Sequence, residues 1–472
     1  MSGNNRAAAA PAGRVAGSFR DPSGYVYRTA EGEIRRSVLP YYGENFRLFL
    51  ESGLKDALLQ KKYLVPFTIL PDNPEPDSVA TLAVEKVPFI SYPYEWSFAQ
   101  LKDAALLTLR IQLLALQHGM MLKDASAYNV QFQHGRAIFI DLLSFEAAGD
   151  QPWAAYGQFC THFLAPLALM AKTDLDLGLL LTQYLDGVPL ALAAKLLPFS
   201  ARFNLGLFLH LFSHAKMQSK HNDARQSAAR ARQAKVSLRA KQLLAEGLLG
   251  LVAGLQRPAS KTEWADYYTD TNYNDTAFAA KKQLIAEFSQ EYSPQRVLDI
   301  GANTGVFSRL AAREGNLVVA ADIDPVAVDK HYVFLKQEKI RDILPLRVNL
   351  VNPPPAIGWD NQERESFLQR CDFDLVMALA LIHHLAISNN LPLPMLARTL
   401  AKMGKYLLIE FVPKEDSQVQ RLLATREDIF PDYHLQGFLQ AFQAEFTLLR
   451  RQEIPDSRRE LFLFQRKKTV AE

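Results

Sequence analysis

The segment 296–326 constrains the fold of this 472-residue chain more than any other stretch. In order, it contains a short β-prone apolar run, a turn bracketed by glycines, a helical stretch and a second apolar run that ends at Asp322. A parallel βαβ unit of this length brings the turn and the end of the second strand to one edge of the sheet. We therefore expect an α/β domain with a ligand site at that edge.

The residue types at this edge predict a nucleoside ligand. Gly301 lets the backbone approach a ligand closely, and Gly305 lets the helix begin close to the strand. The carboxylate of Asp322 can accept hydrogen bonds from both hydroxyls of a ribose. Asp299 places negative charge where a pyrophosphate would be repelled. The D-x-G-x-x-x-G spacing thus favours a cationic or zwitterionic nucleoside over a dinucleotide.

This pattern resembles the first motif of the class I S-adenosylmethionine-dependent methyltransferases, D-x-G-x-G-x-G, with Asn303 at the middle glycine. The resemblance implies a Rossmann-like seven-stranded sheet that binds S-adenosylmethionine, with Asp299 near the methionine end of the cofactor and Asp322 at its ribose. It extends from about residue 264 to the end of the chain. The seven expected strands are 296–300, 317–321, 344–350, 373–379, 405–413, 446–451 and 460–464. The predicted cofactor-binding residues are Asp299, Gly301, Asn303, Gly305, Asp322, Asn349 and Tyr268.

Two of these cofactor residues lie outside the segment 296–326. Asn349 follows the third strand, where the family often has an acidic or amide residue near the adenine amino group. Tyr268 belongs to an aromatic stretch at 264–273 that precedes the first helix of the domain. The aromatic rings of this stretch either contact a sulfonium or the acceptor through cation–π interaction, or they cover that helix.

The predicted acceptor side of the cleft follows the fourth and fifth strands. His383 and His384 come directly after the fourth strand. A histidine with an ordinary pKa of about 6.5 can remove a proton from an acceptor hydroxyl or amine. Glu410 lies at the end of the fifth strand, where its carboxylate can bind the acceptor. These three residues are the predicted catalytic and acceptor-binding groups.

The first half of the chain predicts a small β-rich lobe followed by a helical lobe. Alternating residues at 24–29 and 33–39 indicate a hairpin, and 44–61 has helical periodicity. Two further strands are expected at 63–70 and 79–90. We expect a disordered lead over 1–18, a two-lobed α+β domain over 19–215, a basic helical linker over 216–260 and the methyltransferase domain over 261–472.

Three polar residues of the helical lobe resemble the catalytic segments of protein kinases and aminoglycoside phosphotransferases. Asp124 precedes Asn129 by five residues, and Asp141 follows a short apolar run. The resemblance implies that Asp124 is a base and that Asn129 and Asp141 hold magnesium beside ATP, if this domain is active. The histidine and the glycine-rich phosphate loop of those families are missing, and Arg35 or Arg36 has to replace their lysine. The domain is therefore degenerate, and the alternative is that both aspartates cap turns.

Charge and cysteine content exclude several classes of protein. The formal net charge of +3 predicts no general attraction to nucleic acid. Between Lys216 and Lys241 there are eight Lys or Arg and one Asp, yet aromatic residues for base stacking are missing. A solvated helix between domains is favoured there over contact with RNA or acidic lipid. Cys160 and Cys371 fall in separate predicted domains, which fits a reducing cytoplasm. No apolar run reaches the ~20 residues of a membrane span.

These observations predict a methyltransferase that acts on a glycan or small-molecule acceptor, with the first half of the chain recognising the substrate. The whole chain resembles bacterial class I methyltransferases related to nodulation-associated ones. Two alternatives stay open. One is a bifunctional enzyme that phosphorylates and methylates one acceptor, and the other is a nucleotide-binding scaffold without catalysis.

Overall fold

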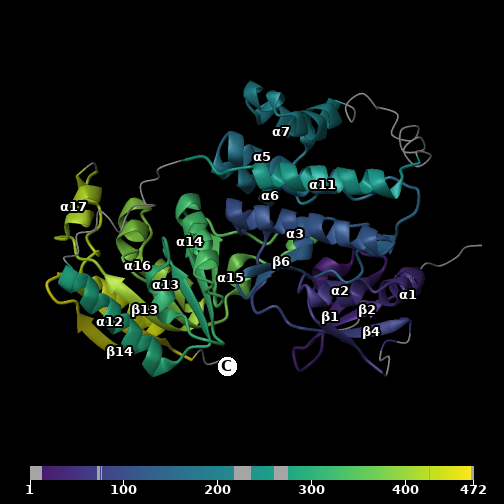
Figure 1. The fold of residues 1–472 in the computed structure, drawn as a ribbon. Coiled ribbons are helices and arrows are strands. Elements are labelled where there is room, and N and C mark those ends of the chain that lie inside the picture. The colour runs from purple at the N-terminus through teal and green to yellow at the C-terminus, as the bar shows by residue number, and fades with distance from the viewer. Residues whose placement is uncertain are drawn as a thin grey trace, which may run out of the picture.

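The computed structural model describes residues 13–71, 75, 77–216, 235–259, 275–424 and 426–468. The amino-terminal half combines a small sheet with a layer of helices, and the carboxy-terminal half is built on a large sheet (Figure 1). Of the expected lead over 1–18, residues 1–12 lie outside the described residues. Residues 13–18 are hydrogen-bonded to the first strand, with Val15 N donating to Val26 O at 2.8 Å.

The small sheet has four antiparallel strands in the order β1-β2-β4-β3. The predicted hairpin at its edge pairs Gly24 with Val38 and Arg28 with Ile34. The expected strand at 79–90 ends earlier, at Val84, because the chain then turns toward Pro88 and leaves the sheet. Two helices follow the hairpin, at the position where helical periodicity was expected. The bounds are β1 Gly24–Arg28, β2 Ile34–Val38, α1 Gly43–Glu51, α2 Leu54–Gln60, β3 Phe67–Ile69 and β4 Ala80–Val84.

The helical layer is organised around α3 (Phe98–Gln117), which lies beside α11 (Leu238–Gly254) in Figure 1. Ser97 caps α3 by accepting the Gln100 N–H at 3.3 Å, and the Gln100 side chain accepts the Ser97 N–H in return. Two short hairpin-like sheets, β5–β8 and β6–β7, follow α3. The remaining bounds here are β5 Met120–Leu122, β6 Val130–Gln133, β7 Arg136–Phe139, β8 Phe145–Ala147, α4 Tyr156–Phe159, α5 Ala165–Lys172, α6 Leu180–Gln183, α7 Leu190–Leu196 and α8 Leu205–Leu207.

The carboxy-terminal sheet has seven strands in the order β11-β10-β9-β12-β13-β15-β14. Five strands are parallel, and β15 pairs antiparallel with both β13 and β14. This confirms the expected α/β fold with a seven-stranded sheet. The strands are β9 Arg296–Ile300, β10 Leu317–Asp322, β11 Ile343–Arg347, β12 Phe373–Ala378, β13 Gly404–Phe411, β14 Phe446–Glu453 and β15 Glu460–Arg466; the helices are α12 Asp275–Tyr292, α13 Val306–Ala311, α14 Pro325–Gln337, α15 Phe367–Arg370, α16 Leu393–Ala401, α17 Ser417–Leu423 and α18 Leu435–Glu445.

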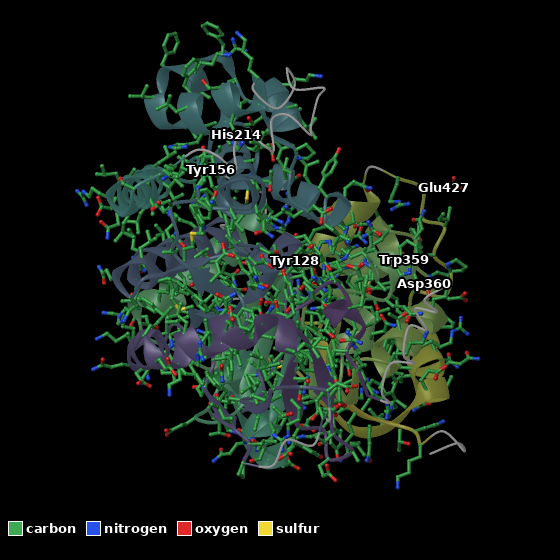
Figure 2. The ribbon with its side chains drawn as sticks, turned by 90° about the vertical axis from the view of Figure 1, so that its right-hand side faces the viewer. Tyr128, Tyr156, His214, Trp359, Asp360 and Glu427 are labelled. Atoms are coloured by element: carbon green, nitrogen blue, oxygen red, sulfur yellow. The ribbon has the colours of Figure 1, made fainter. Side chains whose placement is uncertain are left out.

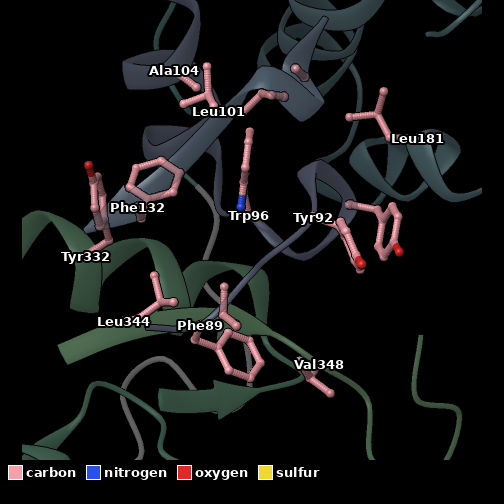
Figure 3. Packing of buried hydrophobic residues seen from close by; sticks show 14 of the residues in the cluster. Phe89, Tyr92, Trp96, Leu101, Ala104, Phe132, Leu181, Tyr332, Leu344 and Val348 are labelled. Atoms are coloured by element: carbon pink, nitrogen blue, oxygen red, sulfur yellow. The ribbon is translucent and has the colours of Figure 1, made fainter. Parts of the chain in front are cut away.

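The two halves share one hydrophobic core. Phe132 of the helical layer meets Tyr332 of α14 edge to face, with ring centroids 5.8 Å apart (Figure 3). Beside this contact the buried Arg370 guanidinium of α15 donates to the Glu95 carboxylate, with one nitrogen–oxygen distance of 3.0 Å. Gln100 also donates to the Pro345 carbonyl at 3.0 Å. The halves therefore pack as one body, while the domain boundaries at 215 and 260 stay predictions.

Candidate active site

The turn after β9 has the backbone that its glycines predict. Gly301 and Gly305 both have φ of +75°, and Asn303 has φ of 50°, so three residues of this turn are left-handed. A Cβ on Gly305 would lie 1.9 Å from the ring of His331 in α14, which leaves no room for a side chain. A Cβ on Gly301 would meet only the Leu381 side chain, at 3.3 Å. Conformation therefore favours glycine at both positions, and Gly305 is needed for space as well.

Asp299 and Asp322 are buried carboxylates at the ends of adjacent strands. Asp299 accepts a hydrogen bond from the Ser308 hydroxyl at 2.6 Å. Asp322 accepts the backbone N–H of Asn303 at 2.7 Å and that of Asp324 at 2.8 Å. Burial raises the pKa of each carboxyl to about 6. Both groups are thus mostly ionised at neutral pH and can accept hydrogen bonds from a ligand.

A cavity of about 420 Å³ opens at this edge of the sheet. It brings together most of the predicted cofactor residues, which come from the loops after three strands. Gly305 is not part of its lining, and Tyr268 lies outside the described residues. The Asn349 side-chain oxygen accepts the Val351 N–H at 2.9 Å and so helps to fix the loop that it belongs to. The predicted residues that line the cavity are Asp299, Gly301, Asn303, Asp322, Asn349 and His384.

The two histidines after β12 have different surroundings. His384 lines the cavity, whereas His383 is fully buried behind it, with the two ring centroids 4.1 Å apart. Burial lowers the pKa of His384 to about 4 and that of His383 well below its ordinary value. Both imidazoles are therefore neutral at pH values near 7. Only His384 is placed to meet an acceptor.

Glu410 is fully buried and does not line the cavity. Its carboxylate accepts from Lys281 Nζ at 2.5 Å and from the Ala380 N–H at 2.9 Å, and Arg459 lies 3.5 Å away. Lys281, from α12, does line the cavity, and its ammonium lies 4.4 Å from the centre of the Phe307 ring. Lys281 therefore lines the cavity where the sequence predicted the acceptor-binding carboxylate of Glu410. Glu410 itself lies behind Lys281 and is paired with it.

Sequence reasoning missed Lys281, although a signal was present. Buried residues of α12 recur at 277, 281, 285 and 288, which is the spacing of one helical face. The second of these positions is a lysine among apolar residues. A charged residue in the buried stripe of a helix needs a partner, and that requirement points to a site.

The three kinase-like residues converge in the amino-terminal half. Asp124, Asn129 and Asp141 line one cavity of about 480 Å³. Arg36 of β2 lies 3.1 Å from Asp141, whereas Arg35 pairs with Glu33. Burial raises the pKa of Asp124. Within the described residues no group of three or more His, Cys, Asp or Glu is arranged to hold a metal ion.

The carboxy-terminal half contributes to this second cavity, which the sequence did not predict. Glu363 and Arg364 from the loop before α15 lie in its wall. Glu363 accepts from Arg20 at 2.7 Å, and the Arg364 guanidinium lies 4.4 Å from the centre of the Tyr128 ring. Residues on both sides of the core therefore shape one charged cavity.

Comparisons with known proteins agree with this geometry. Residues 273–445 match the methyltransferase domain family. The chain is 38% identical over 483 residues to nodulation protein NoeA of Rhizobium meliloti (strain 1021), and the match covers 99% of each protein.

Two solved structures are similar in part. The N-methyltransferase NodS from Bradyrhizobium japonicum WM9 is 13% identical, covers 41% of this chain and 99% of its own, and has a TM-score of 0.31. The bifunctional kinase-methyltransferase WbdD is 15% identical, covers 41% of this chain and 40% of its own, and has a TM-score of 0.30. The predicted methyltransferase is confirmed by the family match and the full-length relative. This chain is an S-adenosylmethionine-dependent methyltransferase and belongs to the family of nodulation protein NoeA.

Proposed function

We propose that this enzyme methylates a glycan or another small polar molecule in the cavity at the edge of its large sheet. One observation carries the proposal: a single cavity is lined by the buried carboxylates Asp299 and Asp322 and also by His384, Ser388 and Asn389. Its volume of about 420 Å³ lies within the range of roughly 300–1,000 Å³ that is usual for small-molecule sites. A concave site of this size suits a small acceptor better than a folded protein surface.

The residues of the cavity fit S-adenosylmethionine, which supplies an electrophilic methyl group when it is bound. The ionised Asp322 has lone pairs that its two backbone partners leave for ribose hydroxyls. Asp299 offers negative charge to the ammonium and sulfonium groups. The left-handed turn at Gly301 and Asn303 lets the backbone border the cavity without a bulky side chain at Gly301. Asn349 is the proposed contact to the adenine.

The chain itself aligns the acceptor and accepts its proton. Methyl transfer is an in-line displacement, so most of the rate enhancement comes from holding donor and acceptor in line. The neutral His384 imidazole can accept a hydrogen bond from an acceptor hydroxyl or amine and take up the proton as the new bond forms. Lys281 adds a fixed positive charge to the same wall and is held there by Glu410.

Label transfer tests the proposal. The enzyme is incubated with tritiated S-adenosylmethionine and separate pools of oligosaccharides, small amines, proteins and DNA. Label is expected in an oligosaccharide or amine pool, and His384→Gln is expected to lower kcat while leaving the affinity for S-adenosylhomocysteine unchanged. Label that enters only the protein or DNA pool contradicts the proposal.

We also propose that the amino-terminal half, over about residues 19–215, recognises the acceptor. Its charged cavity is lined from both halves of the chain, so an acceptor bound there contacts the methyltransferase half as well. A bifunctional kinase-methyltransferase is the second candidate, because Asp124, Asn129 and Asp141 converge beside Arg36.

Titration with ATP and magnesium separates these two functions of the amino-terminal half. If this half serves only in recognition, ATP and magnesium give no binding heat. Binding that disappears in Asp141→Asn, with S-adenosylhomocysteine binding intact, favours the bifunctional enzyme instead.

A further inference from the structure

Six large apolar side chains face solvent at one end of the helical layer, and we call them the apolar ridge. The exposed fraction reaches 80% for Phe203, 71% for Leu205 and 69% for Phe199. Isolated exposed apolar residues are common on protein surfaces, but a contiguous group marks an interaction site. The ridge consists of Leu196, Phe199, Phe203, Leu205, Phe208 and Leu209.

The helical part of the ridge is apolar on both of its faces. Leu205, Phe208 and Leu209 have the i, i+3, i+4 spacing of one helical face and are exposed. Leu207 and Leu211, on the opposite face, are fully buried and already supply the contact with the core. The exposed leucines and phenylalanines are therefore not needed to hold this segment in place.

The ridge projects from the body of the protein on a rigid base. It runs from the end of α7 through η7 (Phe199–Phe203) and α8 into η8 (Phe208–Ser213), and this region stands at the top of Figure 1. In Figure 2 the labelled His214 and Tyr156 lie just below the projecting helices. Their rings stack with centroids 5.2 Å apart, and the Tyr156 hydroxyl lies 2.8 Å from His210 Nδ1. These contacts fix the orientation of the segment that carries the ridge.

The sequence around the ridge is strongly basic, in contrast to the balanced chain. The whole chain has 53 Lys or Arg against 50 Asp or Glu, but the described residues between Gly187 and Ala245 include six Lys or Arg and no Asp or Glu. Within the ridge, the Arg202 guanidinium lies 5.4 Å from the centre of the Phe199 ring, and Lys195 is exposed beside Leu196. Apolar side chains interspersed with cations are complementary to a surface that has an apolar interior beneath an anionic outer layer.

We propose that the apolar ridge docks this protein on the surface of an anionic lipid bilayer. The leucines and phenylalanines enter the boundary between headgroups and acyl chains, while Lys195 and Arg202 meet the lipid phosphates. In the part of the chain that the structure describes, no helix has the length and apolarity to cross a bilayer, which fits docking on its surface. The proposal is independent of the proposed function.

Charge and residue type favour this partner over two others. A second copy of the chain would bring Lys195 and Arg202 of both copies together, and like charges repel. RNA would be held by the cations through its phosphates, but it has no apolar interior to receive Leu205 or Leu209. Of these three partners, only a bilayer can receive the apolar side chains and also attract the cations.

Vesicle co-sedimentation of the full chain tests the proposal. Vesicles of phosphatidylcholine alone are compared with vesicles that also contain phosphatidylglycerol. The protein is expected to sediment with the anionic vesicles, and binding is expected to weaken as salt shortens the Debye length from about 10 Å to about 3 Å. The double variant Phe203→Ser/Leu205→Ser is expected to bind at least about tenfold less, because it exchanges two apolar side chains that would enter the bilayer for polar ones. Lys195→Glu is expected to weaken binding to anionic vesicles.

Matched controls separate docking from misfolding. Tyr41→Ser removes an equally exposed ring, 77% accessible, from the β-rich lobe, and binding is expected to stay unchanged. The thermal unfolding midpoint of the double variant is expected to match that of the wild type, since both residues are mostly exposed. The proposal is overturned if the double variant binds anionic vesicles as tightly as the wild type does. It is also overturned if the wild type binds neutral vesicles as tightly as anionic ones, or binds no vesicles at all. Self-association that the double variant abolishes, or RNA binding that replaces vesicle binding, overturns it as well.

Discussion

Asp299 and Asp322 determine how this site responds to pH. Burial raises the pKa of both carboxyls to about 6, whereas their ordinary pKa is 3.8. Since the folded protein holds these protons more tightly, their contribution to stability is fully present below about pH 3.8 and is lost as the pH rises through about 6. The affinity for the cofactor depends on pH in the opposite direction and rises with pH, because ribose hydroxyls donate hydrogen bonds to the ionised carboxylate. We predict that affinity for S-adenosylhomocysteine falls by about tenfold per unit below about pH 6.

Equilibrium dialysis with labelled S-adenosylhomocysteine over this pH range measures the predicted change in affinity. The variant Asp322→Asn is expected to bind weakly and with a flatter pH profile. An affinity that is constant between about pH 7 and pH 5 in the wild type contradicts the assignment of these carboxylates.

Gly305 offers a second prediction for a single residue. We predict that Gly305→Ala destabilises the protein by about 2–4 kcal/mol, since it adds left-handed strain to overlap with the buried His331 ring. Gly315→Ala is the matched control. Gly315 is also left-handed, with φ of +86°, but its Cβ would meet no atom within 4 Å, so strain of about 1–2 kcal/mol remains alone. Chemical denaturation measures both, and equal losses contradict the steric account.

The sequence correctly predicted those cavity residues whose position is determined by their spacing along the chain. Asp299, Gly301 and Asp322 are such residues, because strand ends and turns place them at one edge of the sheet wherever the βαβ unit forms. It did not predict the partners of Glu410, since Lys281 and Arg459 lie 129 and 49 positions away. Pairings over such distances depend on how helices pack, which periodicity alone does not specify.

At the scale of elements, the Lys281–Glu410 pair connects α12 to β13. Both side chains are buried, and burial lowers the pKa of Lys281. We predict that Lys281→Met destabilises the protein by about 3–5 kcal/mol, because Glu410 loses its main counter-charge in a dry environment. The double variant Lys281→Met/Glu410→Gln is expected to regain most of that stability, as measured by urea unfolding. A double variant that is less stable than the single one contradicts a charge-pairing role.

The elements of the large sheet were predicted better than those of the small one. All seven strands overlap the expected ranges, and the five parallel ones gave the clearest signal because a sheet covered by helices on both faces favours nearly continuous apolar runs. The small sheet has one partly exposed face, and β3 keeps only Phe67–Ile69 of the expected 63–70. There the residues before Phe67 pair with β7 instead, through Val65 N and the Phe139 carbonyl at 2.9 Å.

At the scale of the whole molecule, the two halves are joined through buried polar contacts as well as apolar packing. Arg370 of the carboxy-terminal half contacts Glu95 and also lies 4.5 Å from the centre of the Tyr92 ring. We predict that Arg370→Met destabilises the protein by about 3–5 kcal/mol, because it leaves a buried carboxylate unpaired. Arg239→Met is the control, since its pair with Glu246 is exposed on both sides, 65% and 49%, and contributes about 0–1 kcal/mol. Differential scanning calorimetry measures both, and equal shifts contradict the account.

The arrangement of the two halves was not accessible from the sequence. Motifs identified each half separately, but nothing in their spacing placed Glu363 and Arg364 in the wall of the amino-terminal cavity. That placement follows from shape complementarity between α14 and the helical layer, which involves residues more than two hundred positions apart, such as Tyr332 and Asp103.

Calorimetric titration with S-adenosylhomocysteine tests the central claim, that the cavity beside Asp322 holds the cofactor. The wild type is expected to bind one equivalent, and Asp322→Ala is expected to bind at least about tenfold more weakly, because it loses charge-assisted hydrogen bonds. Asp374→Ala is the matched control. Asp374 also accepts two backbone N–H groups, from Gln295 and Arg296, but at the opposite edge of the sheet. Affinity that is unchanged in Asp322→Ala, or equally reduced in both variants, contradicts the claim.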